Sequence, residues 1–315
     1  MSNNHVKIIY GAFPITNLPK NQLEDVLQLL EKYNVKDLDT ARIYPGSEKS
    51  IGELNLSVSY TIHTKAVAFQ ERSLSKDSIV ESIGESLSLL KTDKVETFYL
   101  HCPDPATPIE ETLEAINELY KDGKFVHFGL SNYPASDVRK IYEYAASKGY
   151  VLPTVYQGNY NAVSRKIEKD LFPVLRELKI AFYAYSPIAG GFLARTVQEI
   201  EEGVEGRFDK STQIGQMYQQ LYNRPSLLKA LDEWNTIAER AGVSKAALAY
   251  RWTAYHSALR EEYGDAVIIG GRTPGQVSET LEAIAEGPLK DDIAAQIENV
   301  WELVKDEAPV DNYSY

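Results

Sequence analysis

The chain has little of several residue types, and each shortage excludes a class of protein. It contains one cysteine, Cys102, in 315 residues, so it cannot form an internal disulfide, and we expect a reducing compartment. No run of about 18 apolar residues is present, which argues against a membrane-spanning helix. The opening stretch "MSNNHVKIIYG" also lacks the apolar core of a signal peptide. These absences predict a cytoplasmic protein that does not act at a membrane.

Positive charge is also scarce. Acidic residues outnumber lysine and arginine by 45 to 33, which gives a formal net charge of −12, and no short stretch concentrates basic residues. Such a surface repels phosphate backbones, so we expect no nucleic-acid partner. His-x-His pairs and the Cys/His spacings of zinc sites are missing as well, so we predict no metal site.

What is present is a regular alternation of two patterns. Segments with helical periodicity, such as 22–33, 77–90 and 108–124, separate short β-rich runs. Eight such runs occur, at 7–13, 37–40, 60–66, 95–101, 125–131, 154–160, 181–187 and 266–271. This order predicts parallel strands joined by right-handed crossovers.

Two folds fit that order, a closed (β/α)8 TIM barrel and an open doubly wound sheet. No G-x-G-x-x-G fingerprint follows any run, and no G-x-x-x-x-G-K-[ST] loop occurs. The count of eight therefore favours the barrel, and the lack of a linker or repeat predicts a single domain over 1–315. We expect residues 188–225 to form a long functional loop after the seventh strand. Helices are predicted at 244–258 and, at the carboxyl end of the chain, at 291–306.

Polar side chains follow the ends of several predicted strands, where barrel enzymes carry their sites. Asp39, Lys65 and His101 end neighbouring runs, and Tyr44 lies five residues after Asp39. A lysine cation near a phenol lowers its pKa, and a carboxylate keeps that lysine charged. Tyr44 could then act as a general acid while His101 orients a carbonyl oxygen. Each residue alone is more often structural, so only their joint position predicts carbonyl reduction by hydride transfer.

Two other histidines, His63 and His127, share the parity of inward-facing strand positions. They precede the strand tips, so we interpret both as polar groups of the barrel core. A metal-dependent hydrolase would need His63, His101 and His127 all at the depth of the strand tips. Only His101 lies at that depth.

Several motifs match, in order and spacing, those of the aldo-keto reductases. They are "DLDTARIY", "HTKA", "FYLHCPD", "GKFVHFGLSNY", "PTVYQGNYN", "LFPVLRELKIAFYAYSPIAGGFL" and "GDAVIIGGRTPGQVSETLEA". The resemblance covers residues 7–305 and is strongest to the aflatoxin-aldehyde reductase branch. It implies an NADPH-dependent oxidoreductase with Tyr44 as proton donor, Lys65 and Asp39 as its partners and His101 as the carbonyl-orienting group.

The resemblance also implies where an extended NADPH would lie. Ser131, Asn132 and Gln157 match residues that bind the nicotinamide carboxamide, and Tyr185 matches the aromatic that stacks on the ring. The pyrophosphate segment corresponds to Ser186, Pro187, Ile188, Gly190, Gly191 and Leu193, with Arg207 reaching the cofactor and Asp39 beside the nicotinamide. The adenosine and 2′-phosphate segment corresponds to Gly270, Gly271, Arg272, Gln276, Glu279 and Thr280. Backbone N–H groups opening the helix after Arg272 would face an anion.

The sequence departs from the branch at its substrate end. Branch members often end in Tyr-Phe-Arg, whereas this chain ends "DNYSY", so Tyr315 stands where an arginine would. Phe13 lies in a divergent segment after Gly11, and we expect Phe13, Tyr44, His101 and Tyr315 to line the substrate pocket. The loss of positive charge predicts an aromatic or neutral carbonyl substrate.

Two points remain open. Potassium-channel β subunits are relatives that bind NADPH as sensors, so a regulatory subunit with little turnover is an alternative function. The branch includes dimers, and a homodimer is possible.

Overall fold

The computed structural model describes residues 6–312 and shows eight parallel strands in one closed barrel. Neighbouring strands in the chain are neighbours in the barrel, and β1 pairs with β8 to close it. The strands are β1 Lys7–Gly11, β2 Asp37–Asp39, β3 Thr61–Lys65, β4 Val95–Leu100, β5 Phe125–Ser131, β6 Pro153–Asn159, β7 Ala181–Tyr185 and β8 Ala266–Ile269. All eight predicted strands are confirmed, and with them the (β/α)8 fold.

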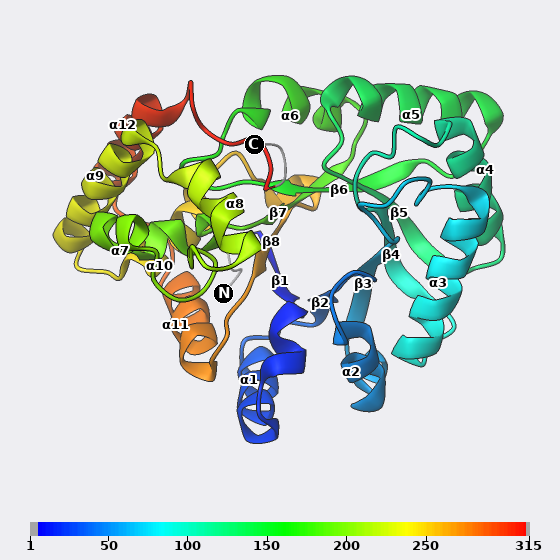
Figure 1. Cartoon of the computed structure of the whole chain (residues 1–315), viewed down its shortest axis with the longest axis horizontal. Coiled ribbons are helices and arrows are strands. Elements are labelled where there is room, and N and C mark those ends of the chain that lie inside the picture. Colours follow the sequence, from blue (N-terminus) through cyan, green and yellow to red (C-terminus); the bar gives the residue numbers. More distant parts are fainter. Residues whose placement is uncertain (1–5, 313–315) are drawn as a thin grey trace.

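Helices surround the barrel on its outer side (Figure 1). They are α1 Lys20–Lys32, α2 Ser47–Glu53, α3 Lys76–Leu90, α4 Ile109–Lys121, α5 Ala135–Lys148, α6 Ile167–Glu177, α7 Val197–Glu202, α8 Gln213–Tyr222, α9 Pro225–Ala241, α10 Lys245–Arg251, α11 Pro274–Ala285 and α12 Asp291–Val304. Their buried stripes pack on the outward-facing strand residues, as in α4, where Leu113, Ile116 and Leu119 are buried. The hydrophobic effect on these stripes is the main force that holds helices to barrel.

Two sequence predictions need correction. Residues 188–225 are largely helical and not an irregular loop, because they form the short 3-10 helix Ala189–Ala194, then α7 and α8. The helix expected at 244–258 is two elements, α10 and a π-helical turn at Trp252–His256. In both segments aromatic residues such as Phe192, Tyr222 and Trp252 are buried. Their burial supplies an apolar contact that favours compact helical turns over loop.

The interior of the barrel is filled, so it is not a pore. Ile9, Tyr99, Val155, Tyr183, Ala266 and Ile268 form a buried apolar cluster inside it. A Cβ at Gly129 would lie 2.2 Å from the Tyr99 ring, so glycine is required there for the tyrosine to fit. His63 packs edge-on against Tyr183 of this cluster at 5.9 Å, with 1% of its surface exposed, and its Nε2 is 2.9 Å from Asp37 Oδ1. The prediction that His63 is a core polar group is confirmed.

The interpretation of His127 as a core group is wrong. Its side chain is 44% exposed and lies 3.5 Å from Glu96. Four residues of β5 follow His127, and its neighbour Val126 is 40% exposed as well, so solvent reaches this lower end of the strand.

One buried carboxylate joins the segments around β7 and β8. Asp265 is 1% exposed and accepts hydrogen bonds from the backbone N–H groups of Phe182 and Arg260, each at 2.8 Å. The guanidinium of Arg176 on α6 binds both of its carboxylate oxygens. A charged group with this many donors is well compensated for its burial. Asp265 therefore joins α6, β7 and the segment before β8 at the lower end of the barrel, opposite the mouth.

Candidate active site

At the carboxyl ends of β2, β3 and β6, buried polar side chains are linked in series by hydrogen bonds. Lys65 Nζ donates to Asp39 Oδ2 and to the Thr40 carbonyl, both at 2.7 Å. Gln157 Nε2 donates to the other oxygen of Asp39 at 2.8 Å. Asp39, Lys65 and Gln157 are each at most 3% exposed. Ion pairs this far from water keep fixed geometry, so Lys65 is held at one position under the barrel mouth.

Tyr44 lies above Lys65 in the loop that follows β2. The lysine nitrogen is 5.3 Å from the centre of the Tyr44 ring, and the ring of His101 packs edge-on against Tyr44 at 6.2 Å. Two successive turns fix the loop, because Tyr44 N–H donates to Ala41 and Ser47 N–H donates to Tyr44. The structure thus brings Asp39, Tyr44, Lys65 and His101 together at one end of the barrel.

The side chains that follow Tyr44 anchor this loop from behind. Ser47 Oγ accepts from Thr40 Oγ1 at 2.8 Å and donates to the Ala12 carbonyl at 3.0 Å. Glu48 is 2% exposed and accepts from the hydroxyl of Thr64, the neighbour of Lys65, at 2.6 Å. Sequence reasoning missed both anchors, since a Ser-Glu pair at a helix start is an ordinary pattern.

The direction of the pKa of Tyr44 corrects the sequence prediction. Burial raises the pKa of Tyr44 above its ordinary value, and the nearby cations of Lys65 and Arg207 lower it only in part. The prediction of a net decrease is wrong, because desolvation of the phenolate outweighs the attraction of the cations. At neutral pH Tyr44 keeps its proton.

His101 is uncharged at neutral pH. Burial, with a smaller effect of the Lys65 cation, lowers the pKa of His101 to about 3. Its Nδ1 is buried and has no hydrogen-bond partner among residues 6–312. Asn132 Nδ2 binds the backbone carbonyl of His101 at 2.9 Å, which fixes the residue beside Tyr44. A neutral imidazole in this position can offer one ring nitrogen to a carbonyl oxygen.

The residues predicted for the nicotinamide surround this polar chain. Asn132 has a φ of 65°, an unusual conformation that turns its amide back over β5. Its Nδ2 donates to Ser131 Oγ at 3.0 Å, and its Oδ1 accepts from the Tyr185 hydroxyl at 2.8 Å. Ser131, Asn132 and Tyr185 therefore form a continuous rim next to Gln157.

The segment after β7 turns sharply at the mouth. Ser186, Gly190 and Gly191 all have positive φ, and a Cβ at Gly190 would lie 2.0 Å from the Tyr218 ring. The side chain of Leu193 is fully buried, and its carbonyl accepts from the Trp234 indole at 2.9 Å. Pro187 is buried and Ile188 is half-buried. Leu193 therefore belongs to the core beneath the turn, whereas Gly190 and Gly191, half-buried and buried, supply the positive φ angles that the turn needs.

Two arginines, Arg195 and Arg272, meet beside that turn, and Arg207 lies near it against Tyr218. A Cβ at Gly206 would lie within 3.3 Å of guanidinium nitrogens of both Arg195 and Arg272, and Arg207 Nη1 donates to the Tyr218 hydroxyl at 2.9 Å. Arg195 Nε is buried without a partner among residues 6–312. The proximity of Arg272 adds to burial in lowering the pKa of Arg195. Like charges brought together in this way form a site suited to an anion.

Sequence reasoning predicted Arg207 and Arg272 but missed Arg195. The sequence showed no basic patch because the three arginines are separated along the chain. The only local signal for Arg195 is its place shortly after the paired glycines.

The amino end of α11 is less open than predicted. The backbone N–H of Arg272 already donates to Gln276 Oε1 at 2.8 Å. The backbone N–H of Gln276 donates to Thr273 Oγ1 at 3.3 Å. Thr280 is 4% exposed, so it lies on the inner face of the helix. Gly270, Arg272, Gln276 and Glu279 are exposed, and Gly271 is half-buried. An anion here would meet the Arg272 guanidinium before those backbone groups.

Two aromatic rings flank the tetrad of Asp39, Tyr44, Lys65 and His101 on its open side. Phe13 packs edge-on against Tyr44 at 5.3 Å, and Phe69 packs against His101 at 5.7 Å. The predicted pocket residue Tyr315 lies outside the described residues. The chain before it returns to the mouth after α12 (Figure 1), where Asn312 Nδ2 donates to Ser186 Oγ at 2.9 Å.

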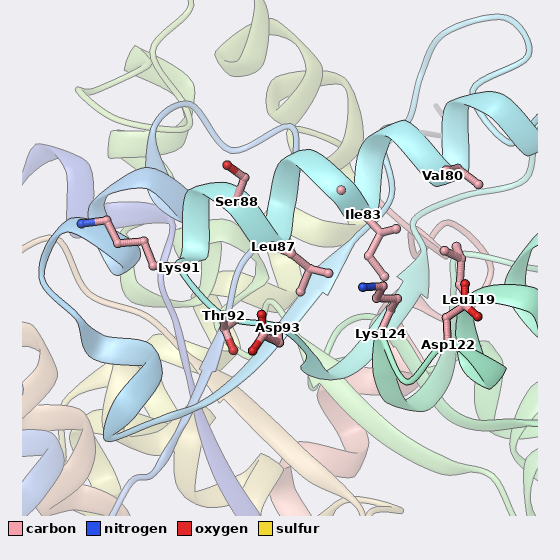
Figure 2. Close-up of a pocket in the computed structure, with 11 residues that line it drawn as sticks. Val80, Ile83, Leu87, Ser88, Lys91, Thr92, Asp93, Leu119, Asp122 and Lys124 are labelled. Atoms are coloured by element: carbon pink, nitrogen blue, oxygen red, sulfur yellow. The ribbon is translucent and has the colours of Figure 1, made fainter.

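Other parts of the described chain offer less chemistry. No three His, Cys, Asp or Glu side chains within residues 6–312 gather to hold a metal ion, and no helix in that range is long and apolar enough to cross a membrane. A groove of about 590 Å³ lies between α3 and α4, near the loops that enter β4 and β5 (Figure 2). Those loops are at the opposite end of the strands from the tetrad, and the groove holds none of its residues.

Comparison with known proteins places this chain in a family. The model of the aldo/keto reductase family matches residues 7–302. The chain is 41% identical over 290 residues to "Oxidoreductase sirO" of Leptosphaeria maculans, covering 91% of this chain and 88% of that protein. It is 38% identical over 293 residues to "Aflatoxin B1 aldehyde reductase member 2" of Rattus norvegicus, covering 87% and 78%.

A solved structure supports the fold alone. The glycerol dehydrogenase AKR11B4 from Gluconobacter oxydans is 21% identical and superposes with a TM-score of 0.74, covering 100% of this chain and 99% of that one. The family match and the two relatives confirm the resemblance to the aldo-keto reductases and to their aflatoxin-aldehyde reductase branch. The chain is an oxidoreductase that belongs to the aldo/keto reductase family.

Proposed function

We propose that this protein reduces an aldehyde or ketone to an alcohol with NADPH, with Tyr44 as the proton donor. The observation that carries the proposal is the buried chain from Gln157 through Asp39 to Lys65, which ends beneath the Tyr44 ring beside a neutral His101. A phenol over a fixed cation is suited to give up a proton as negative charge develops on a carbonyl oxygen.

The arginines at the mouth support a phosphate-bearing cofactor. Arg195 and Arg272 form a local positive pair in a chain of net charge −12, and Arg207 lies nearby with its Nη1 on the Tyr218 hydroxyl. Arginine binds phosphate through two parallel N–H donors. Arg272 would hold the 2′-phosphate, Arg195 and Arg207 would face the pyrophosphate, and the rim of Ser131, Asn132 and Gln157 would hold the nicotinamide amide.

Each side chain at the site would have a separate role in the reaction. When bound, NADPH would supply the hydride. Tyr44 would hold the proton on its hydroxyl and release it to the carbonyl oxygen, and the Lys65 cation would stabilise the phenolate that remains. His101, uncharged at neutral pH, would donate a hydrogen bond to the same oxygen and orient it. Asp39 would hold Lys65 in place through their 2.7 Å ion pair.

The relatives support the same class of reaction. Two proteins similar to this chain carry aldehyde reductase or oxidoreductase in their names. The rings of Phe13 and Phe69 at the pocket support an aromatic or neutral carbonyl rather than an acidic one. A small molecule is the only partner that this site requires, and a cytoplasmic homodimer stays a prediction from the sequence.

The test is a spectrophotometric assay of the purified protein with NADPH and 4-nitrobenzaldehyde. We expect consumption of NADPH by the wild type and its near-complete loss in Tyr44→Phe. Turnover that survives Tyr44→Phe would reject this residue as the acid. Tight NADPH binding without turnover of any carbonyl would support the sensor function instead.

A further inference from the structure

Four rings form a continuous row across the open side of the site. Phe13 packs edge-on against Tyr44 at 5.3 Å, Tyr44 against His101 at 6.2 Å, and His101 against Phe69 at 5.7 Å. Phe13, Tyr44 and Phe69 come from the segments after β1, β2 and β3, and His101 follows β4. The two reacting groups of the proposed mechanism thus stand between two phenylalanines.

The outer rings of the row are exposed although they are large and apolar. Phe13 is 41% exposed and Phe69 is 58% exposed. An exposed aromatic pair at the edge of a reaction site is poorly placed for the core and well placed to contact a ligand.

The backbone at Phe69 supports the same interpretation. Phe69 has a φ of 63°, a conformation that is unfavourable for a bulky residue and easy for glycine. A strained backbone at a functional site is a common sign that the side chain is needed there. More than half of this side chain faces solvent at the mouth.

We propose that Phe69 is a specificity-determining residue that, together with Phe13, selects carbonyls carrying a flat apolar substituent. The proposal rests on the proposed function. A planar aryl group on a carbonyl held at Tyr44 and His101 would bury apolar surface against Phe69 or Phe13, in the edge-on geometry that aromatic pairs prefer. A polyhydroxylated substituent would lose its water there without gaining a hydrogen bond.

The experiment compares selectivity and stability in one set of variants. The ratio of kcat/KM for 2-naphthaldehyde to kcat/KM for glyceraldehyde is measured for wild type, Phe69→Gly, Phe69→Leu and Tyr120→Ala. Tyr120 is a suitable control because it is an exposed aromatic, at 43%, on α4 away from the mouth. Each ratio uses a single preparation, so it does not depend on the fraction of folded protein.

We expect Phe69→Gly to lower the ratio about ten-fold, with a melting temperature equal to or above that of wild type, because glycine accepts the positive φ. Phe69→Leu should lower the ratio less, and Tyr120→Ala should leave it unchanged. An unchanged ratio in Phe69→Gly, or an equal loss on both aldehydes, would overturn the proposal. Wild-type protein that reduces neither aldehyde would instead overturn the proposed function.

Discussion

Removal of the Lys65 charge should affect stability and activity by separable amounts. Lys65 is 1% exposed and its pair with Asp39, at 2.7 Å, is buried on both sides. In Lys65→Met the Asp39 carboxylate keeps only the Gln157 donor. Breaking a buried pair by removing one partner costs about 3–5 kcal/mol.

The size of the thermal effect follows from the length of the chain. An unfolding entropy of about 2.1 cal/mol/K per residue over 315 residues makes 3–5 kcal/mol equivalent to a decrease of about 5–8 °C in Tm. Removal of the opposite charge as well, in Asp39→Asn/Lys65→Met, should restore most of the loss, because no buried charge is then uncompensated. Carbonyl reduction should be lost in both variants, since Tyr44 lacks its cation in each.

Urea denaturation and calorimetry measure the first effect, and NADPH consumption measures the second. Lys49→Met is the control, because Lys49 is 64% exposed and pairs with Glu53 on the same helix. This variant should change the free energy of unfolding by less than about 1 kcal/mol. A double variant no more stable than Lys65→Met would refute the reasoning, as would a Lys65→Met protein as stable as wild type.

Four further predictions concern other parts of the molecule. Tyr44→Phe should lower kcat/KM by about 10²–10⁴ while the free energy of unfolding stays close to that of wild type; a drop in stability of several kcal/mol would show a structural role instead. The pKa of His101 is lowered to about 3, so below about pH 6.5 the unfolded chain binds a proton that the folded chain does not. The free energy of unfolding should therefore decrease as pH falls from about 6.5 toward 3. His101→Asn should flatten this dependence in urea titrations at several pH values. Arg195→Ala should weaken NADPH binding about ten-fold or more in isothermal titration calorimetry, as loss of a charged donor predicts, and unaltered affinity would exclude Arg195 from the phosphate site. Asp265→Asn should lower the free energy of unfolding by about 3–5 kcal/mol and leave NADPH affinity unchanged, because Asp265 lies at the opposite end of the barrel.

The amino-acid sequence by itself determined the barrel and the members of the tetrad. Strands and helices follow from local periodicity, so eight alternating runs were enough to place the strands within about two residues. Asp39, Lys65 and His101 were found because parallel strands bring their carboxyl ends to one face, which makes strand order a guide to spatial proximity.

Only the tertiary structure decided how these groups behave. The pKa of Tyr44 depends on how much water its hydroxyl loses, and that is a property of the assembled mouth; the expected decrease is therefore an increase. The solvent exposure of His127 depends on its depth at the lower rim, which strand parity does not specify.

Groups from distant segments gave no signal in the sequence. Arg195 and Arg272 meet only because the insertion after β7 folds against the tip of β8, and Phe69 was an isolated aromatic in a polar loop until the fold placed it against His101. Local patterns record which residues share an element. Charge clusters, burial and ring contacts at the mouth arise between elements, so they are decided by packing.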